Sequence, residues 1–596
     1  MKSLVKHASV IALLVGALGV LSLAGCGGDE PAPASDKKIF YDARRSAHKS
    51  LDPPRQFDGA SAEIVMNVFD TLVEYDYLAR PYRLAPNLVE SLPEPSADGR
   101  TYTFRLRKGV HFHDDPSFEG GKGRELTADD AIYSIKRFAD ANVNLKSWVL
   151  MAGFVVGLDE FREKTRELGK GVDYDSLEVA GLRKLDDYSF EVEFTNKNPL
   201  ALFPFAMTSL SIVPREAVEK YGEDFGAKPV GTGPFRIKQF SFRGTMILQK
   251  NPNYHLHYPS EGAPGDAEAG LLEAAGKPLP FLDEIHMPLI EEPQPAMLKF
   301  RKAELDWIGI DKDNFPNMAF KSPDGSFHLK EDYARLYNHY AEPRLSAEYF
   351  SFNLKDPLFR DNPALRQAFA LAIDTPAFID LLMNGRALPL QTIVPHPIAG
   401  SERDLDFEYW QQDRELAKQK LAEAGYPNGE GLPEVVFEYR AATKDSRQGF
   451  EFIRNELAEV GIRAKASFNT FSAFLKKIET GNFQIASAGW QADYPDAENF
   501  YQLVYGPNKT PGPNSSTFAN PEFDALYRQI RYMENGPERN ELFRQMAQIL
   551  KDEVPLLLRF NGIAFGIYQK NVRNMKRHML VDKPYKYLDK QGDPVL

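Results

Sequence analysis

The chain contains a single cysteine in 596 residues, and its position constrains both its compartment and its fold. Cys26 follows an apolar run over residues 8–23, which itself follows a charged start carrying Lys2 and Lys6. A charged start, an apolar run and small residues in this order are typical of a secretory signal. Because no second cysteine exists, the rest of the chain has to fold without an internal disulfide, on its buried cores alone.

The residues around the cysteine refine this prediction. Leu23, Ala24, Gly25 and Cys26 resemble the bacterial lipoprotein box, in which the cysteine is acylated and becomes the new N-terminus. We therefore expect a signal peptide over residues 1–25, a lipid anchor on Cys26 and a tether over residues 26–38, with a reach of about 20 Å. An uncleaved membrane anchor and an ordinary cleaved signal remain open alternatives.

Charge and length restrict the classes of partner. The formal charge is -12, which argues against a nucleic-acid partner and against attachment to a membrane through basic residues. No second apolar run approaches membrane-spanning length. The length predicts three or four domain-sized units.

Short strand-like and helical segments alternate along the chain, which predicts an α/β fold. Residues 101–106 alternate as a half-buried strand, and Thr127 with Asp130 forms a capping box that opens a helix through residue 138. In the second half we expect a strand at 435–437 and helices over 362–373, 413–424, 449–460 and 522–533.

Five segments in one order carry a family resemblance. They lie at residues 104–114 with 126–130, at 231–235 with 248–254, at 352–374, at 422–433 and at 489–496, the last reading Gly489-Trp490-Gln491-Ala492-Asp493-Tyr494-Pro495-Asp496. Together they resemble family 5 of the bacterial extracellular solute-binding proteins, whose members include oligopeptide- and dipeptide-binding proteins. Residues 115–124, 140–180 and 255–277 look like insertions relative to that pattern.

The resemblance implies a two-lobed α/β fold of the periplasmic-binding-protein type (type II, cluster C-like), with an extra domain in the N-terminal lobe. Residues 37–60, 231–350 and 555–596 would form lobe I, residues 61–230 the additional domain, and residues 351–554 lobe II. The two connecting strands would cross between the lobes near residues 350–352 and 554–555.

The resemblance also implies a function. We expect the substrate-binding component of an ABC importer, a monomer in the periplasm or cell envelope that captures a peptide and delivers it to permease subunits in the inner membrane. No cofactor, nucleic acid or catalysis is expected. The same fold with a nickel complex, haem, an oligosaccharide or an opine as ligand remains the alternative, and a hydrolase or a purely structural lipoprotein is more remote. Which membrane holds the anchor stays open.

The expected binding residues follow from the matched motifs. By resemblance, Asp493 holds the α-ammonium group of the peptide, and Trp490 and Tyr494 line the cleft. Phe352 and Asn353 would offer backbone groups to an extended ligand. Arg440 and Arg447, together with Lys444, are candidates for the ligand carboxylate, although solvated surface charge is the better explanation for each of them.

Other interpretations of these residues remain open from the sequence. Asp493 could cap a loop or helix near Pro495, and Trp490 could belong to a core. His111 and His113 could share one face of a strand as metal ligands, but no third ligand accompanies them. We therefore expect no metal site.

Overall fold

The computed structural model describes residues 37–56, 58–143 and 147–595. By its internal contacts the chain divides into Met1–Lys38 and Ile39–Leu596, and the description below concerns the second unit. The expected signal peptide and Cys26 lie outside the described residues. Within the described part, no helix combines the length and the apolar character that crossing a membrane requires.

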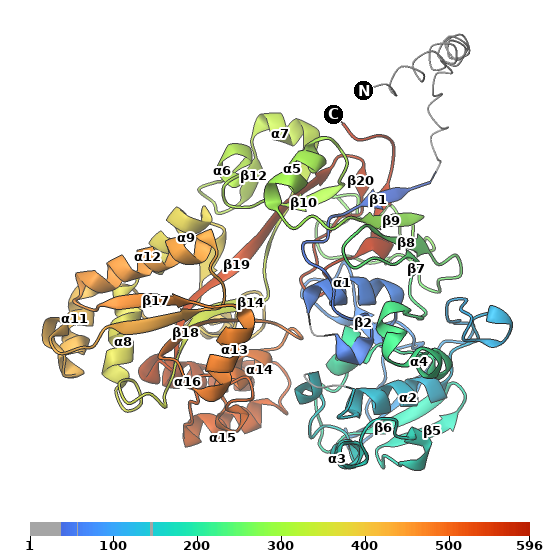
Figure 1. The fold of residues 1–596 in the computed structure, drawn as a ribbon, viewed down its shortest axis with the longest axis horizontal. Helices are drawn as coiled ribbons and strands as arrows, with labels where there is room; N and C mark the ends of the chain where they lie inside the picture. The colour runs from blue at the N-terminus through green and yellow to red at the C-terminus, as the bar shows by residue number, and fades with distance from the viewer. Residues whose placement is uncertain (1–36, 57, 144–146, 596) are drawn as a thin grey trace, which may run out of the picture. The chain divides into compact units, whose positions relative to one another are not determined.

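One long strand, β19 (Leu556–Gln569), organises the larger sheet (Figure 1). Its first half pairs with β14 and β15, and its second half pairs with β10 and β13, all antiparallel. The sheet continues from β14 through β18 and β16 to β17. The bounds of these strands are β10 (Trp307–Gly309), β13 (Tyr337–Pro343), β14 (Ser346–Phe352), β15 (Ala387–Pro389), β16 (Val435–Tyr439), β17 (Ala464–Phe468) and β18 (Ile485–Gln491).

The chain passes twice between the two halves of this sheet. β13 ends at Pro343 and β14 begins at Ser346, while on β19 the pairing changes from β15 to β13 between Gly562 and Ile563. The passages expected near residues 350–352 and 554–555 therefore lie a few residues away, before the first of these positions and after the second. Strand-forming residues continue on both sides of each passage, so the sequence contains no visible break there. The full set of expected domain bounds stays a prediction.

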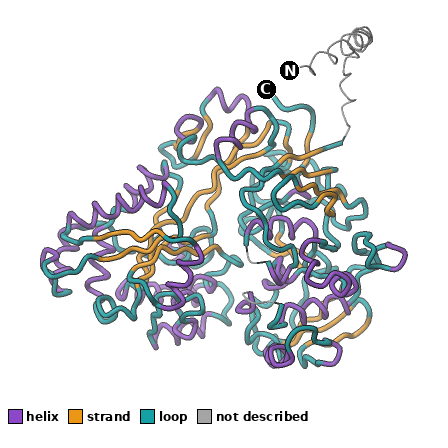
Figure 2. The backbone as a smooth tube through the Cα atoms, viewed as in Figure 1, coloured by secondary structure: helices purple, strands orange, loops and turns teal. Residues whose placement is uncertain are grey.

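The remaining strands form smaller sheets, shown in orange in Figure 2. A four-stranded sheet has the order β1-β9-β8-β7, a three-stranded sheet has the order β4-β6-β5, and three strand pairs complete the set. Their bounds are β1 (Ile39–Tyr41), β2 (Val73–Tyr75), β3 (Leu84–Pro86), β4 (Thr101–Arg105), β5 (Leu182–Asp186), β6 (Ser189–Glu193), β7 (Phe235–Gln239), β8 (Met246–Lys250), β9 (Glu284–Met287), β11 (Ala319–Lys321), β12 (Phe327–Leu329), β20 (Val572–Arg573) and β21 (Asp589–Lys590).

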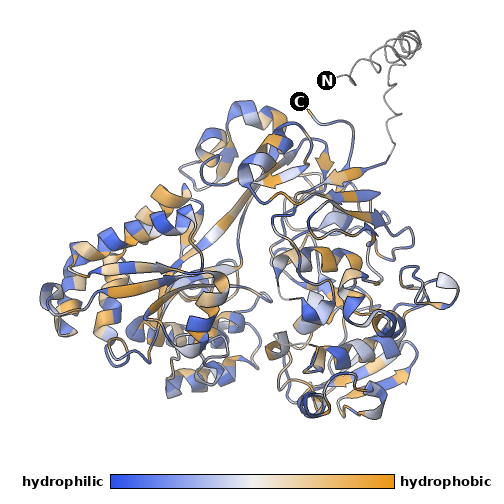
Figure 3. Ribbon diagram, in the orientation of Figure 1, coloured by the Kyte–Doolittle hydropathy of each residue, from blue (hydrophilic) through white to orange (hydrophobic). Residues whose placement is uncertain are grey.

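The α-helices alternate with these strands and carry hydrophobic and hydrophilic residues side by side (Figure 3). Their bounds are α1 (Gly59–Val68), α2 (Ala128–Ala139), α3 (Leu158–Leu168), α4 (Arg215–Tyr221), α5 (Pro293–Arg301), α6 (Phe315–Met318), α7 (Glu331–Leu336), α8 (Pro363–Ala372), α9 (Thr375–Met383), α10 (Glu402–Leu405), α11 (Arg414–Glu423), α12 (Lys444–Glu459), α13 (Phe471–Thr480), α14 (Glu498–Tyr501), α15 (Pro521–Ile530) and α16 (Pro537–Glu553).

Most expected helices begin where a capping residue predicts. The capping box of Thr127 and Asp130 opens α2, and the Asp413 side chain accepts a hydrogen bond from Leu416 N–H at the start of α11. α12 differs, because it begins at Lys444 behind the capping Thr443, five residues before the expected start. The expected start at residue 449 therefore missed the Thr443 cap.

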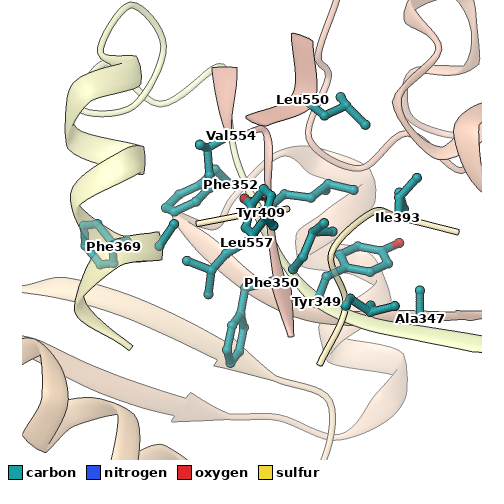
Figure 4. Packing of buried hydrophobic residues seen from close by; sticks show 14 of the residues in the cluster. Ala347, Tyr349, Phe350, Phe352, Phe369, Ile393, Tyr409, Leu550, Val554 and Leu557 are labelled. Carbon is teal, nitrogen blue, oxygen red and sulfur yellow. Dashed lines mark hydrogen bonds between the residues drawn. The ribbon is translucent and has the colours of Figure 1, made fainter. Parts of the chain in front are cut away.

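Two large buried clusters form the cores. Core A belongs to the second half of the chain and packs β14 and β19 against α8; Phe350, Phe352 and Phe369 lie within it (Figure 4). Core B belongs mainly to the first half and runs from Phe40 through residues of the expected additional domain to Leu588. Core B therefore continues without a break across the expected bounds at residues 60 and 230.

Truncating Phe352 to Ala should destabilise the protein by about 3–5 kcal/mol, because its ring is fully buried between Phe359 and Phe369. Urea unfolding followed by circular dichroism measures the change. The matched control is Phe320→Ala, where the ring is 46% exposed and little should be lost. Equal effects of the two substitutions would contradict the placement of Phe352 in core A.

Candidate functional site

The loop after β18 is held in shape by Asn499. The Asn499 side-chain oxygen accepts hydrogen bonds from the indole N–H of Trp490 and from the backbone N–H of Asp493, both at 3.0 Å. Its amide nitrogen donates to the Asp493 carboxylate at 2.9 Å. One buried amide thus fixes the positions of both Trp490 and Asp493. A position six residues beyond Asp493 carried no signal in the sequence.

Asp493 is an acid without a counter-ion. No ion pair to this carboxylate occurs within the described residues, and the Asn499 amide is its hydrogen-bonding partner among them. Burial raises the pKa of Asp493 to about 6, with a further contribution from Glu498, while the Asn499 bond opposes the shift. A desolvated carboxylate of this kind is costly to keep ionised unless a cation reaches it.

The neighbouring acids are satisfied by the protein itself. Asp496 forms a buried two-point ion pair with Arg539, with N···O distances of 2.7 and 2.8 Å. Glu498 accepts hydrogen bonds from the hydroxyls of Tyr494 and Tyr527. Asp493 is therefore the one acid of this group that is left for an external partner. The alternative that Asp493 caps a helix is not what is observed, since Asp496 accepts the Glu498 backbone N–H instead.

Residues from the first half of the chain approach Asp493. The ring of Phe203 stacks on Tyr494 with centroids 5.6 Å apart, and on Tyr75 at 6.4 Å. The Tyr75 hydroxyl is buried and has no hydrogen-bond partner in the described residues. Burial, and then the nearby Asp493, raise the pKa of Tyr75. The site is thus built from residues far apart in sequence, since Phe203 and Tyr75 precede Asp493 by 290 and 418 residues. Neither Tyr75 nor Phe203 lies in a segment that the sequence marked as part of a site.

Tyr494 and Trp490 have different positions in this site. Tyr494 is buried, with its hydroxyl bonded to Glu498, so it supports the loop and has no free polar group. Trp490 is partly exposed, packs against core A and has its N–H committed to Asn499. Its ring face remains the part that could contact a ligand.

A cluster of charged residues lies around Glu348 on β14, the strand that pairs with β18. Glu348 on β14 packs directly against Gly489 on β18, where an added Cβ would come within 2.7 Å of the carboxylate. Arg440 lies 3.8 Å from Glu348. Burial raises the pKa of Glu348, while the nearby cations Arg440, Arg559 and Arg344 lower it. Arg440 is thus the expected cation that the structure brings nearest to the Asp493 loop.

Arg447 and Lys444 lie on α12, away from this cluster of charged residues. Arg447 is exposed and stacks over the ring of Phe468, 4.6 Å from its centroid. Lys444 is exposed and pairs with Asp313 at 3.0 Å. Neither contacts Glu348 or Asp493, which is consistent with solvated surface charge.

Phe352 and Asn353 lie at the opposite end of the strand pair from Asp493. Phe352 pairs with Ile485 at the start of β18, whereas Asp493 follows its end. The Phe352 backbone N–H donates to Pro555 and the Asn353 N–H to Gln484, and the Asn353 amide bonds to Gly481 and Phe483. The backbone N–H groups of both residues are thus already used within the protein, and a role of these residues in ligand binding stays a prediction.

The histidine pair has a structural explanation. His113 is buried with its Nε2 2.9 Å from the Gly233 carbonyl, whereas His111 is exposed and lies beside Glu125. The described residues contain no cluster of three or more His, Cys, Asp or Glu side chains that could hold a metal.

Comparisons with known proteins agree with this architecture. Residues 83–512 match the family model described as bacterial extracellular solute-binding proteins, family 5 Middle. The chain is 27% identical to a dipeptide-binding protein of Escherichia coli over 82% of this chain and 83% of that one, and 25% identical to heme-binding protein A of Haemophilus influenzae over 93% and 92%. A solved structure described as the ABC transporter-associated periplasmic binding protein DppA from Helicobacter pylori, in complex with peptide STSA, has a TM-score of 0.72 at 23% identity and covers 93% of this chain and 99% of its own. The expected two-lobed α/β fold is confirmed.

Replacing Asp493 with Asn should stabilise the unliganded protein at neutral pH. A carboxyl whose pKa is about 6 when folded and near 3.8 when unfolded stabilises the fold only while it is protonated. That stabilisation is complete below about pH 3.8 and is lost as the pH rises through about 6. Two pKa units correspond to about 3 kcal/mol, so the variant should gain up to that amount at pH 7 and almost nothing at pH 4.

Urea unfolding at the two pH values measures this difference. The control is Asp496→Asn, which leaves Arg539 buried without its partner and should destabilise the protein by about 3–5 kcal/mol at pH 7. A loss of stability in Asp493→Asn at pH 7 would show that Asp493 is compensated after all.

Proposed function

We propose, from the premise that this chain belongs to family 5 of the bacterial extracellular solute-binding proteins, that it captures short peptides for an ABC importer. The observation that carries the proposal is the uncompensated carboxylate of Asp493. A peptide α-ammonium group is a cation of the right size to pair with it, and a charge-assisted hydrogen bond in a desolvated site is strong.

Several features support a ligand that is zwitterionic. Asp493 provides a negative pole, and Arg440 is one of three arginines that lie near Glu348 on β14. Trp490 and the aromatic rings of Tyr75 and Phe203 supply apolar surroundings. Haem, the ligand that the name of one relative suggests, would bring two carboxylates and no ammonium group to Asp493, so the geometry favours a peptide.

The binding protein itself makes and breaks no covalent bond in this proposal. An acid pair for hydrolysis would need Asp496, whose carboxylate is engaged by Arg539. Ligand contact with both halves of the chain drives closure about the passages at residues 343–346 and 562–563, and the closed form docks on the permease. In the full proposal Cys26 is acylated, and the monomer is tethered in the periplasm.

Native mass spectrometry of protein purified from its producing cells, without refolding, tests the ligand class. We expect co-purified masses that fit short peptides. A single non-peptide mass, such as haem or a metal complex, would overturn the peptide proposal and leave the family assignment intact.

Asp493→Asn should weaken the binding of peptides with a free N-terminus by about 100-fold or more, because a buried charge loses its partner. N-acetylation of the peptide should weaken binding to the wild type by a similar factor. Isothermal titration calorimetry measures both. The control is Glu415→Gln, an exposed acid on α11 whose substitution should leave affinity unchanged. Unchanged affinity in Asp493→Asn would exclude the ammonium role.

A further inference from the structure

Arg559 occupies an unusual place in β19. The register between β14 and β19 shifts between Glu348 and Tyr349, opposite Arg559, so this residue sits in a bulge of the ladder. Its guanidinium group lies over the rings of Phe350, Phe378 and Phe560, with centroid distances of 4.9, 4.3 and 4.9 Å. Such stacking is favourable for arginine, because its planar group is weakly hydrated.

The N–H groups of the Arg559 side chain have no hydrogen-bond partner within the part of the chain that the structure describes. The described residues provide neither an ion pair nor a side-chain hydrogen bond to the guanidinium group. The Arg559 residue is half-buried, so part of it remains accessible to solvent. Aromatic rings thus lie against the guanidinium group, and none of the described residues accepts a hydrogen bond from its N–H groups. A stacked guanidinium whose N–H groups are unused is suited to planar, two-point binding of a carboxylate.

A second unused donor lies beside it. The hydroxyl of Tyr439, at the end of β16, is buried and has no hydrogen-bond partner among the described residues. Its ring packs against Phe350 at a centroid distance of 6.0 Å, so Arg559 and Tyr439 share the same neighbour. Burial raises the pKa of Tyr439 to about 12, which keeps the hydroxyl protonated as a donor.

The local charge is positive. Three arginines, Arg440, Arg559 and Arg344, lie close enough to Glu348 to lower the pKa of its carboxyl. Arg440 is the closest of the three to Glu348, at 3.8 Å, which leaves Arg559 without a tight counter-ion. A half-buried cation of this kind has lost part of its hydration, which an anion can replace.

This positive cluster lies near the negative pole of the site. Glu348 packs against Gly489, and Asp493 follows four residues later in the chain. Four residues of extended backbone span at most about 14 Å, which matches a peptide of about two to four residues.

We propose that Arg559 and Tyr439 form an anion-binding subsite that takes a carboxylate of the bound peptide. This subsite rests on the proposed peptide function and extends it, because it assigns the acidic end of the ligand to groups inside the strand ladder rather than to the exposed arginine and lysine of α12. The carboxylate can come from the C-terminus of the peptide or from an acidic side chain.

Calorimetric titration with three probes separates these sources. The probes are trialanine, its C-terminal amide, and the C-terminal amide of an alanine–glutamate–alanine tripeptide. If the C-terminus occupies the subsite, the wild type should bind the free acid about 10- to 100-fold more tightly than either amide. If an acidic side chain occupies it, the glutamate-containing amide should bind more tightly than the plain amide by that factor.

Two variants assign the effect to the subsite. Arg559→Met removes the charge and keeps a long apolar side chain. Tyr439→Phe removes only a hydroxyl that has no hydrogen-bond partner in the described residues. We therefore expect the Tyr439→Phe variant to fold even if Arg559→Met does not. Each should abolish most of the preference for the carboxylate-bearing probe while leaving affinity for the plain amide within about twofold. The control is Lys551→Met in α16, which removes a cation that lies over the ring of Trp410. This substitution should leave the affinity for all three probes unchanged.

The results distinguish the two levels of the proposal. A wild type that binds none of the probes, and no peptide in a mixed di- to tetrapeptide library, overturns both the peptide function and the subsite. A wild type that binds peptides, with Tyr439→Phe and every folded Arg559→Met sample retaining the full preference for the carboxylate, overturns the subsite alone.

Discussion

The backbone hydrogen bonds of β19 are the constraint on which the rest of the second unit depends. Because one continuous strand pairs with β14 and β15 in its first half and with β10 and β13 in its second, it belongs to two packing environments at once. Neither half can slip in register without moving the other, since a slip of one residue would turn every side chain to the opposite face. The pairing of β14 with β19 is interrupted at one point, a bulge at Arg559 opposite Glu348 and Tyr349.

The electrostatics around β18 divide acids that stabilise the fold from the one that is free for function. Asp496 pairs with Arg539, and Glu498 accepts hydrogen bonds from two tyrosine hydroxyls. A buried carboxylate with such partners costs the fold little stability. Asp493, only three residues from Asp496, receives a single amide hydrogen bond. The fold therefore bears a local loss of stability at Asp493, as is common where a binding site needs an unsatisfied charge.

Motif and pattern predicted the framework of the molecule, but not the inside of the site. The capping residues Thr127, Asp130 and Asp413 act locally, over three or four positions, and sequence reasoning found them. Asp493 was found because it belongs to a recognisable segment. Tyr75 and Phe203 approach it only through the tertiary fold, and a tyrosine or phenylalanine in a half-buried strand or turn carries no mark of that. For Phe352 and Asn353 the sequence likewise did not reveal that their backbone N–H groups are used within the protein, because proximity to a connecting strand does not show which donors the sheet engages.

The same unpaired charge can couple ligand capture to closure. Bringing Tyr75 and Phe203 over Asp493 removes water from a carboxylate, which is unfavourable unless a cation is present. In an empty cleft that penalty opposes closure, whereas a bound ammonium group converts the same desolvation into a stronger ion pair. The ligand then shifts the equilibrium by its differential affinity for the closed form, and no separate latch is required. An acid that the protein left unpaired is, on this reasoning, what makes closure conditional on the ligand.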